Sequence, residues 1–194
     1  MEFPVVVKVG GSLIDDLDPI LFSLKNSGRP VLIVPGGGRF ADLVRRTGVS
    51  GDAAHWMAIA AMEQTGWYIV SKGVSPVTRL RVPPGVEVLL PYDVLRSADP
   101  LPHSWDITSD TISAWIASRL SLPLILLKSV DGIRSGGMLQ DQVNGELQTE
   151  DVDPCFIGYV IASGVKTTVI NGRAPGRLKL LLEGGEVPGT TIGF

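Results

Sequence analysis

Cysteine and histidine are nearly absent from this sequence. Cys155 is the only cysteine in 194 residues, and His55 and His103 are the only histidines. One cysteine excludes an intrachain disulfide, and so few thiol and imidazole ligands argue against a transition-metal site. We therefore expect an intracellular, cytoplasmic protein whose side chains form no metal site.

A basic surface and long apolar runs are missing as well. The 17 lysines and arginines are balanced by 20 acidic residues, and the two signs are interspersed. This pattern gives no basic stripe of the kind that neutralises a nucleic-acid backbone. No apolar segment approaches the roughly 20 residues that span a bilayer, and the first residues do not resemble a signal peptide. Small-molecule chemistry is favoured over nucleic-acid or membrane partners.

What is present is an alternation of strand-like and helix-like apolar segments. The length of 194 residues and the hydrophobic fraction of 44% suit a single domain, 1–194. Strands are expected over 3–9, 30–34, 86–90, 123–127, 167–170 and 190–192. Helices are expected over 17–26, 40–47, 52–72, 109–120, 155–163 and 176–182. Prolines recur between 75 and 103, where helices should be short or absent, and 136–153 should be a hairpin or loop. The alternation predicts an α/β fold, a three-layer αβα sandwich with a mainly parallel sheet, whose ligands lie beyond the carboxyl ends of the strands.

Two glycine-rich turns follow predicted strands, Gly10-Gly11-Ser12 and Gly36-Gly37-Gly38. Glycine lets backbone N–H groups approach anionic oxygens closely, so two such turns suit a donor and an acceptor phosphate. Lys8 lies near the end of the first strand, where an ammonium is costly unless it reaches an anion or a cleft. The alternative interpretation is that both glycine-rich segments are tight turns that bind no ligand and that Lys8 reaches solvent.

Other phosphate-binding signatures fit poorly. Gly36-x-Gly38-x-x-Ala41 matches the loose dinucleotide fingerprint, which expects an acidic residue about twenty positions later at the end of a strand. Here that region, 52–62, is predicted to be helical. The P-loop and protein-kinase motifs are absent from the sequence. Another kind of phosphotransferase is indicated.

Four motifs occur in a fixed order: Lys8-Val9-Gly10-Gly11-Ser12, Val34-Pro35-Gly36-Gly37-Gly38, Thr108-Ser109-Asp110 and Val130-Asp131-Gly132. In this order they resemble the amino-acid kinase family, which includes acetylglutamate, aspartate, uridylate and isopentenyl phosphate kinases. The resemblance extends to the terminal segment 188–192. It implies an acceptor-binding half (about 1–105), an ATP-binding half (about 106–194), a requirement for ATP and Mg²⁺, and a homodimer or larger homo-oligomer.

The resemblance also implies residue roles. The ATP side comprises Lys8, Gly10, Gly11, Ser12, Lys128, Ser129, Asp131 and Gly132; Lys8, Asp110 and Lys128 are the expected catalytic residues, with Asp110 organising the lysines. The acceptor side comprises Gly36, Gly37, Gly38, Arg39, Asp52, Asp106 and Thr108. Arg45 and Arg46 are expected to be solvated. Many relatives carry Gly-Gly-Met followed by a catalytic lysine, but Gly136-Gly137-Met138 lies in the expected hairpin and the next lysine is Lys166.

Among the small members, the chain is most similar to archaeal kinases of methanofuran biosynthesis, which convert an aminomethylfuran methyl phosphate to a diphosphate. The short length and the segment 104–110 prompt this comparison. Asp106 is a candidate partner for the acceptor amine, with Trp105 or Tyr92 against its ring. Uridylate, isopentenyl phosphate or an amino acid are alternative acceptors, and a non-catalytic nucleotide- or oxyanion-binding protein is the alternative class.

Overall fold

A computed structural model describes residues 3–193, so Met1, Glu2 and Phe194 of the predicted domain lie outside the described residues. One sheet of eight strands runs through the described part of the chain. Its order is β3 (Ser75–Val77), β4 (Val86–Leu89), β2 (Val31–Pro35), β1 (Val5–Val9), β5 (Leu124–Lys128), β9 (Thr167–Asn171), β10 (Thr190–Ile192) and β8 (Gln142–Val143). All neighbours are parallel except β9 and β10, so only β10 and β8 run in the opposite direction. The predicted mainly parallel sheet is confirmed.

The central strands are apolar on both sides because helices cover both faces of the sheet. Side chains alternate between the faces, and Val6 packs in one buried cluster while Val5 and Val7 pack in the other. Lys8 shares the parity of Val6 and therefore points to the same face as Val6. This placement decides which helix the lysine meets.

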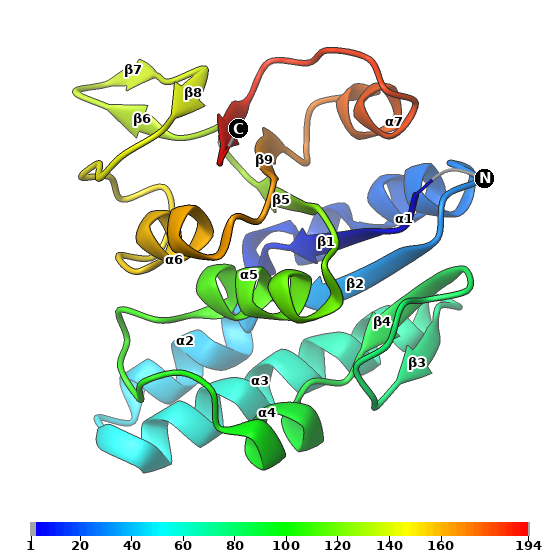
Figure 1. The fold of residues 1–194 in the computed structure, drawn as a ribbon. Helices are drawn as coiled ribbons and strands as arrows, with labels where there is room; N and C mark the ends of the chain where they lie inside the picture. Colours follow the sequence, from blue (N-terminus) through cyan, green and yellow to red (C-terminus); the bar gives the residue numbers. More distant parts are fainter. Residues whose placement is uncertain (1–2, 194) are drawn as a thin grey trace.

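Two layers of helices enclose the sheet (Figure 1). On the Val6 face lie α5 (Ser109–Leu120) and α6 (Phe156–Ser163), whose Ile116 and Phe156 are fully buried. On the other face lie α1 (Leu17–Lys25) and α7 (Arg177–Leu182), which contribute Leu24 and Leu182 to the second cluster. The αβα sandwich is thus observed as predicted.

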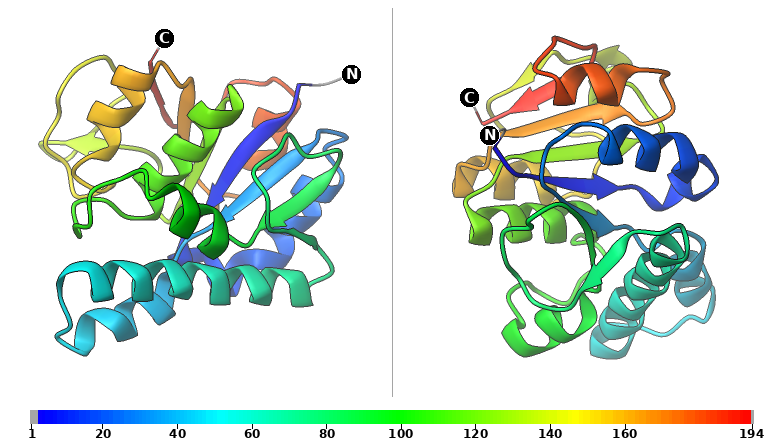
Figure 2. Two further views of the ribbon diagram at one scale, coloured as in Figure 1. Left: turned by 60° about the horizontal axis from the view of Figure 1, so that its bottom comes forward. Right: turned by 90° about the vertical axis from the view of Figure 1, so that its right-hand side faces the viewer.

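Three further helices lie on the side of the first half of the chain: α2 (Gly38–Arg46), α3 (Gly51–Ser71) and α4 (Tyr92–Ala98). The helices α2 and α3 pack against each other, and Figure 2 shows the long α3 lying across the ends of β1 and β2. A short 3₁₀ helix, η1 (Gly11–Asp16), follows β1 directly. The glycine turns therefore stand where the sheet meets this group of helices.

The segment 134–139 is a hairpin of β6 (Arg134–Ser135) and β7 (Met138–Leu139), which begins two residues before the segment 136–153 that we expected to be a hairpin or loop. The remainder of 136–153 is loop apart from β8. Gly136 and Gly137 form its turn with φ of 56° and 82°, angles that favour glycine. The Gly-Gly-Met sequence is a hairpin turn here.

The predicted shortness of helices between residues 75 and 103 is also confirmed, since α4 has seven residues. Within residues 3–193, no helix has both the length and the apolar character that a membrane crossing requires.

Candidate active site

Lys8 and Lys128 both bind the carboxylate of Asp110. The Nζ atom of Lys8 lies 2.6 Å from Oδ1, and that of Lys128 lies 2.9 Å from Oδ2. Lys8 and Asp110 are each only 3% exposed. The fold explains the meeting, because Lys8 on β1 and Lys128 at the end of β5 point to the face that α5 covers, and Asp110 stands in the first turn of α5.

The pKa values of these groups reflect burial and pairing. Burial lowers the pKa of the Lys8 ammonium, against the opposing pull of Asp110. Burial alone would raise the pKa of Asp110, but the charges and hydrogen bonds of Lys8 and Lys128 outweigh it and hold the pKa at about 2. Asp110 is therefore ionised at neutral pH and accepts hydrogen bonds instead of taking up a proton. Two ammonium groups meet at this carboxylate, so an anion that approaches it would lie beside both cations.

A second buried carboxylate, Asp153, supports the first and was missed by the sequence analysis. It accepts hydrogen bonds from the backbone N–H and hydroxyl groups of both Thr108 and Thr111. Its own N–H donates to Oδ2 of Asp110 at 3.3 Å. Asp153 therefore caps the start of α5 from 43 positions away, a relation that no local sequence signal reveals.

The two glycine-rich turns touch each other. A Cβ atom on Gly11 would lie 2.1 Å from the Cα of Gly38, and one on Gly36 would lie 2.7 Å from the amide nitrogen of Gly11. Gly38 has φ of +50° and opens α2, and Gly11 opens η1, so amides of both turns fall in first helical turns. Only glycine permits this approach, and the two glycine-rich turns meet at one point.

The predicted nucleotide side is held together by side chains at the carboxyl ends of β5 and β9. Asp131 accepts hydrogen bonds from Asn171 at 3.1 Å and Arg177 at 2.7 Å, and the bond from Arg177 lowers the pKa of Asp131. Arg173, which the sequence analysis did not single out, donates to the carbonyl of Ser12 at 3.0 Å and to Asp16 at 2.9 Å. The loop after β9 therefore anchors the first glycine turn.

Ser129 and Gly132 lie in the turn that follows Lys128 at the end of β5. A Cβ atom on Gly132 would lie 2.6 Å from the hydroxyl oxygen of Thr190, which accepts a hydrogen bond from Ile133. The terminal strand thus fixes the turn that follows Lys128. Lys166, the next lysine after the hairpin, precedes β9 at the opposite edge of the sheet, where its carbonyl accepts from Leu124.

A cavity of about 280 Å³ opens from the glycine turns toward α2, α3 and the segment 103–109. Of the predicted acceptor residues, Gly37, Gly38 and Thr108 line it, together with Gly11 and Ser12 from the ATP side. Gly36 stands directly behind Gly11, and Asp52 binds His103 of the cavity wall at 2.7 Å. The remaining lining residues are Ala41, Asp42, Arg45, Gly51, Ala54, His55, Ala58, Ile59, Met62, His103, Ser104, Trp105, Ile107, Ser109 and Ile112.

Like Gly36 and Asp52, the predicted acceptor residues Arg39 and Asp106 do not line this cavity. Arg39 binds Asp15 at 3.0 Å on the surface, and Asp106 accepts a hydrogen bond from Ser104 at 3.1 Å. Arg45, which we expected to be solvated, has a side chain that is 49% exposed, and it also lines the cavity and stacks over the ring of Trp105 at 4.4 Å.

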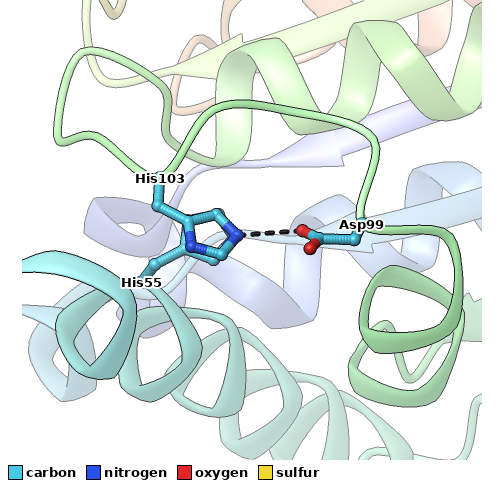
Figure 3. A group of neighbouring side chains, drawn as sticks. All are labelled: His55, Asp99 and His103. Atoms are coloured by element: carbon cyan, nitrogen blue, oxygen red, sulfur yellow. Dashed lines mark hydrogen bonds and ion pairs between the residues drawn. The ribbon is translucent and has the colours of Figure 1, made fainter.

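His55 and His103 stack in the cavity wall with ring centroids 3.9 Å apart (Figure 3). His103 lies 2.8 Å from Asp99 through Nε2 and 2.7 Å from Asp52 through Nδ1. Hydrogen bonds first to Asp99 and then to Asp52 raise the pKa of His103, whereas burial and the neighbouring His103 lower that of His55. The sequence analysis left both histidines without a role, because they are 48 positions apart (103 − 55).

Comparisons with known proteins place this arrangement in a family. No family model matches the chain. The [5-(aminomethyl)furan-3-yl]methyl phosphate kinase of Methanocaldococcus jannaschii is 33% identical over 200 residues, covering 92% of this chain and 93% of that protein. Solved structures of an isopentenyl phosphate kinase and of the Archaeoglobus fulgidus uridylate kinase share the fold, each with a TM-score of 0.67. Their identities are 18% and 19%, over 97% and 99% of this chain and all of theirs. The chain belongs to the amino-acid kinase family of ATP-dependent phosphotransferases.

Proposed function

We propose that this protein transfers the terminal phosphoryl group of ATP to [5-(aminomethyl)furan-3-yl]methyl phosphate and forms the diphosphate, in the cytoplasm and as a step of methanofuran biosynthesis. The observation that carries the proposal is the pair of lysines on Asp110 beside two touching glycine turns, in a chain related over 92% of its length to a kinase named for that phosphate. The cavity beyond the turns is the acceptor site of this proposal.

The chemistry requires one bond to form and one to break. An oxygen of the acceptor phosphate attacks the γ-phosphorus of ATP, the bond to the β–γ bridging oxygen breaks, and ADP leaves. The acceptor oxygen is already ionised near neutral pH, so no side chain has to remove a proton. In this proposal Lys8 and Lys128 stabilise charge on the transferred group, amides of Gly10, Gly11 and Ser12 bind it, and Asp110 positions the lysines.

We propose magnesium as the cofactor, although the carboxylates of Asp110 and Asp131 are already bonded to cationic side chains. Both oxygens of Asp110 already accept bonds from lysines, and Asp131 is bound to Arg177. Mg²⁺ usually keeps several waters and binds through substrate phosphates with few protein ligands. We therefore propose that it enters on the phosphates of ATP, where it would neutralise charge.

The deciding experiment is an assay for ADP formation over a panel of phosphorylated acceptors. The panel contains the aminomethylfuran phosphate, uridylate, isopentenyl phosphate and an amino acid, and the product is identified by mass and by ³¹P resonances of a diphosphate. We expect the aminomethylfuran phosphate to give the highest kcat/KM. Greater turnover of uridylate or isopentenyl phosphate would reassign the acceptor, and nucleotide binding without product on any acceptor would indicate a non-catalytic protein.

Matched lysine variants separate catalysis from folding in this assay. Lys8→Ala and Lys128→Ala should each lower kcat by about 10²- to 10³-fold, because each removes a cation from the transferred group. Lys179→Ala is the control, since the side chain of Lys179 on α7 is 61% exposed. Equal activity of the Lys8 and Lys179 variants would contradict the proposed mechanism.

A further inference from the structure

The histidine pair and Asp99 form a set of metal ligands outside the phosphoryl-transfer site. His55 lies on α3, whereas Asp99 and His103 lie on the segment that follows α4 (Figure 3). One potential ligand atom from each of the three side chains lies within 4.8 Å of the others. Imidazole nitrogens and a carboxylate oxygen are the donors that zinc, cobalt and nickel accept together.

The surrounding residues fit such a site. Asp52 bonds to Nδ1 of His103 at 2.7 Å, which leaves Nε2 on the side of Asp99. A carboxylate behind a histidine is the usual outer partner of a metal-binding imidazole, because it fixes the ring and makes it a better donor. His55 and His103 are stacked with 17° between their planes. Because an imidazole nitrogen binds a metal in the plane of its ring, each ring must turn about its side-chain bonds before both can face one ion.

The geometry of Asp99 is consistent with this role. Asp99 ends α4 in the left-handed conformation, with φ of 39°, a conformation that is uncommon outside glycine. Its carboxylate oxygen lies 2.8 Å from Nε2 of His103. An ion bound to both at about 2.0–2.1 Å with a tetrahedral angle needs them roughly 3.3 Å apart. Because Asp99 is exposed, this half-ångström adjustment requires no movement of the core. His55 must move further by rotation of its side chain, since the ligand atoms of the three residues are separated by up to 4.8 Å.

From this placement we propose that His55, Asp99 and His103 bind one divalent transition-metal ion, with Asp52 as the outer partner of His103. The ion would join α3 to the segment after α4 and so stiffen one wall of the acceptor cavity, which His55 and His103 line. A fourth coordination position would be open to water or to an acceptor oxygen. The sequence argued against a metal because it contains so few ligands, and the fold gathers both histidines at one place.

The test uses the full chain without a histidine tag, ATP or acceptor, so its outcome does not depend on the proposed kinase reaction. Co²⁺ is titrated into the protein and followed by visible absorption, and Zn²⁺ binding is measured by calorimetry. We expect one ion per chain. Since the chain has only these two histidines, imidazole ligation detected by pulsed EPR of Cu²⁺-loaded protein must come from them, and the His55→Gln and His103→Gln variants show whether both contribute.

The variants give a graded expectation. His103→Gln and Asp99→Asn should abolish Co²⁺ binding in the titrated range, and Asp52→Asn should weaken it by about 10- to 100-fold. Asp93 is an exposed carboxylate on α4, the helix that Asp99 ends, and the Asp93→Asn variant should bind Co²⁺ as the unaltered protein does. Binding that persists in His103→Gln and Asp99→Asn, or no binding to the unaltered protein, would overturn the proposal. Circular dichroism of each variant verifies that it is folded.

Discussion

At the scale of single residues, the cluster of Asp110 and two lysines sets how the protein responds to acid. Asp110 is buried and bonded to Lys8 at 2.6 Å and Lys128 at 2.9 Å. Protonating the carboxyl group would break both pairs and leave ammonium groups without a counter-ion in a region of little solvent. Such a loss is costly when charges are removed from water.

The first prediction concerns stability at low pH. The pKa of Asp110 is about 2 in the folded protein and near 3.8 when unperturbed, so this group stabilises the fold above pH about 4. The contribution, on the order of 2 kcal/mol, is lost as pH falls from about 4 through about 2. Urea unfolding between pH 5 and pH 2 measures it. The Asp93→Asn variant should lose as much free energy of unfolding over this range as the unaltered protein, whereas that of Asp110→Asn should depend less on pH. Parallel pH curves for the unaltered protein and Asp110→Asn would contradict the assignment.

The second prediction concerns recognition of the acceptor amine. Asp106 was the expected partner, but Asp42 lines the cavity and Asp106 does not. We expect Asp42→Asn to raise KM for the aminated acceptor by about 10-fold while leaving KM for a deaminated analogue unchanged, since a lost charge-assisted hydrogen bond costs roughly 1.5 kcal/mol or more. Asp106→Asn is the matched control. An equal effect of Asp42→Asn on both acceptors would exclude amine pairing by this residue.

At the scale of elements, α5 depends on a cap supplied from elsewhere in the chain. Thr108 stands at the N-cap position of this helix, but its own side chain makes no capping hydrogen bond. The carboxylate of Asp153 instead accepts from Thr108 and Thr111 in the first turn. The same turn carries Asp110, so the cap and the candidate catalytic carboxylate are held by one set of bonds.

The third prediction follows from this shared support. Asp153→Asn should lower the free energy of unfolding by about 1–3 kcal/mol, because the amide group cannot accept all four hydrogen bonds. It should also lower kcat more than it raises KM at a temperature where the variant is fully folded. Glu150→Gln, an exposed change three positions away, serves as the control. Reduced stability with unchanged kcat would show that Asp153 supports only the helix.

Elements were predictable where a residue pattern is local. The apolar runs of β1, β2 and β5 and the periodicity of α3 and α5 identified these elements, and glycine marked the turns. The strand β3 was missed because it has three residues, includes Pro76 and is mostly exposed. The helix α4 lies among prolines, which weakened its signal. Short edge elements are defined by their neighbours more than by their own residues.

The site divides in the same way. Lys8 was predicted because a lysine near the end of an apolar strand stands out in a sequence, and the roles of Asp110 and Lys128 were implied by the family resemblance. Asp153, Arg173 and the histidine pair were not, because their roles arise from contacts across 40 or more positions in the chain. Proposals for such residues become possible only when the fold places the partners together.

At the scale of the whole molecule, α2 and α3 leave an apolar groove exposed. The groove is lined by Phe40, Leu43, Val44, Thr47, Met57, Ala60, Ala61 and Gln64. Leu43 is 63% exposed, and Trp67 further along α3 is 53% exposed. Large apolar side chains gathered on one surface commonly mark an interface between proteins.

The fourth prediction is therefore that two copies of the chain associate through α2 and α3. Light scattering after size-exclusion chromatography should give a mass near twice 20.7 kDa. Leu43→Glu should shift the protein to the monomer, since a charge would be buried in the interface. Phe22→Glu is the matched control, because Phe22 is 69% exposed on α1, a different helix. A dimer that survives Leu43→Glu and dissociates with Phe22→Glu would place the interface on α1.

The contact between Gly11 and Gly38 has a consequence for how such a protein can be recombined. Both glycines belong to the first half of the chain, and so does Lys8, whereas the second half supplies Asp110 and Lys128. A chimera that keeps residues 1–105 and takes its second half from a relative would keep both glycine turns, but the relative would have to supply the arginine that here donates to the carbonyl of Ser12. Donor preference should then follow the new half, provided that it brings a carboxylate and a lysine to Lys8.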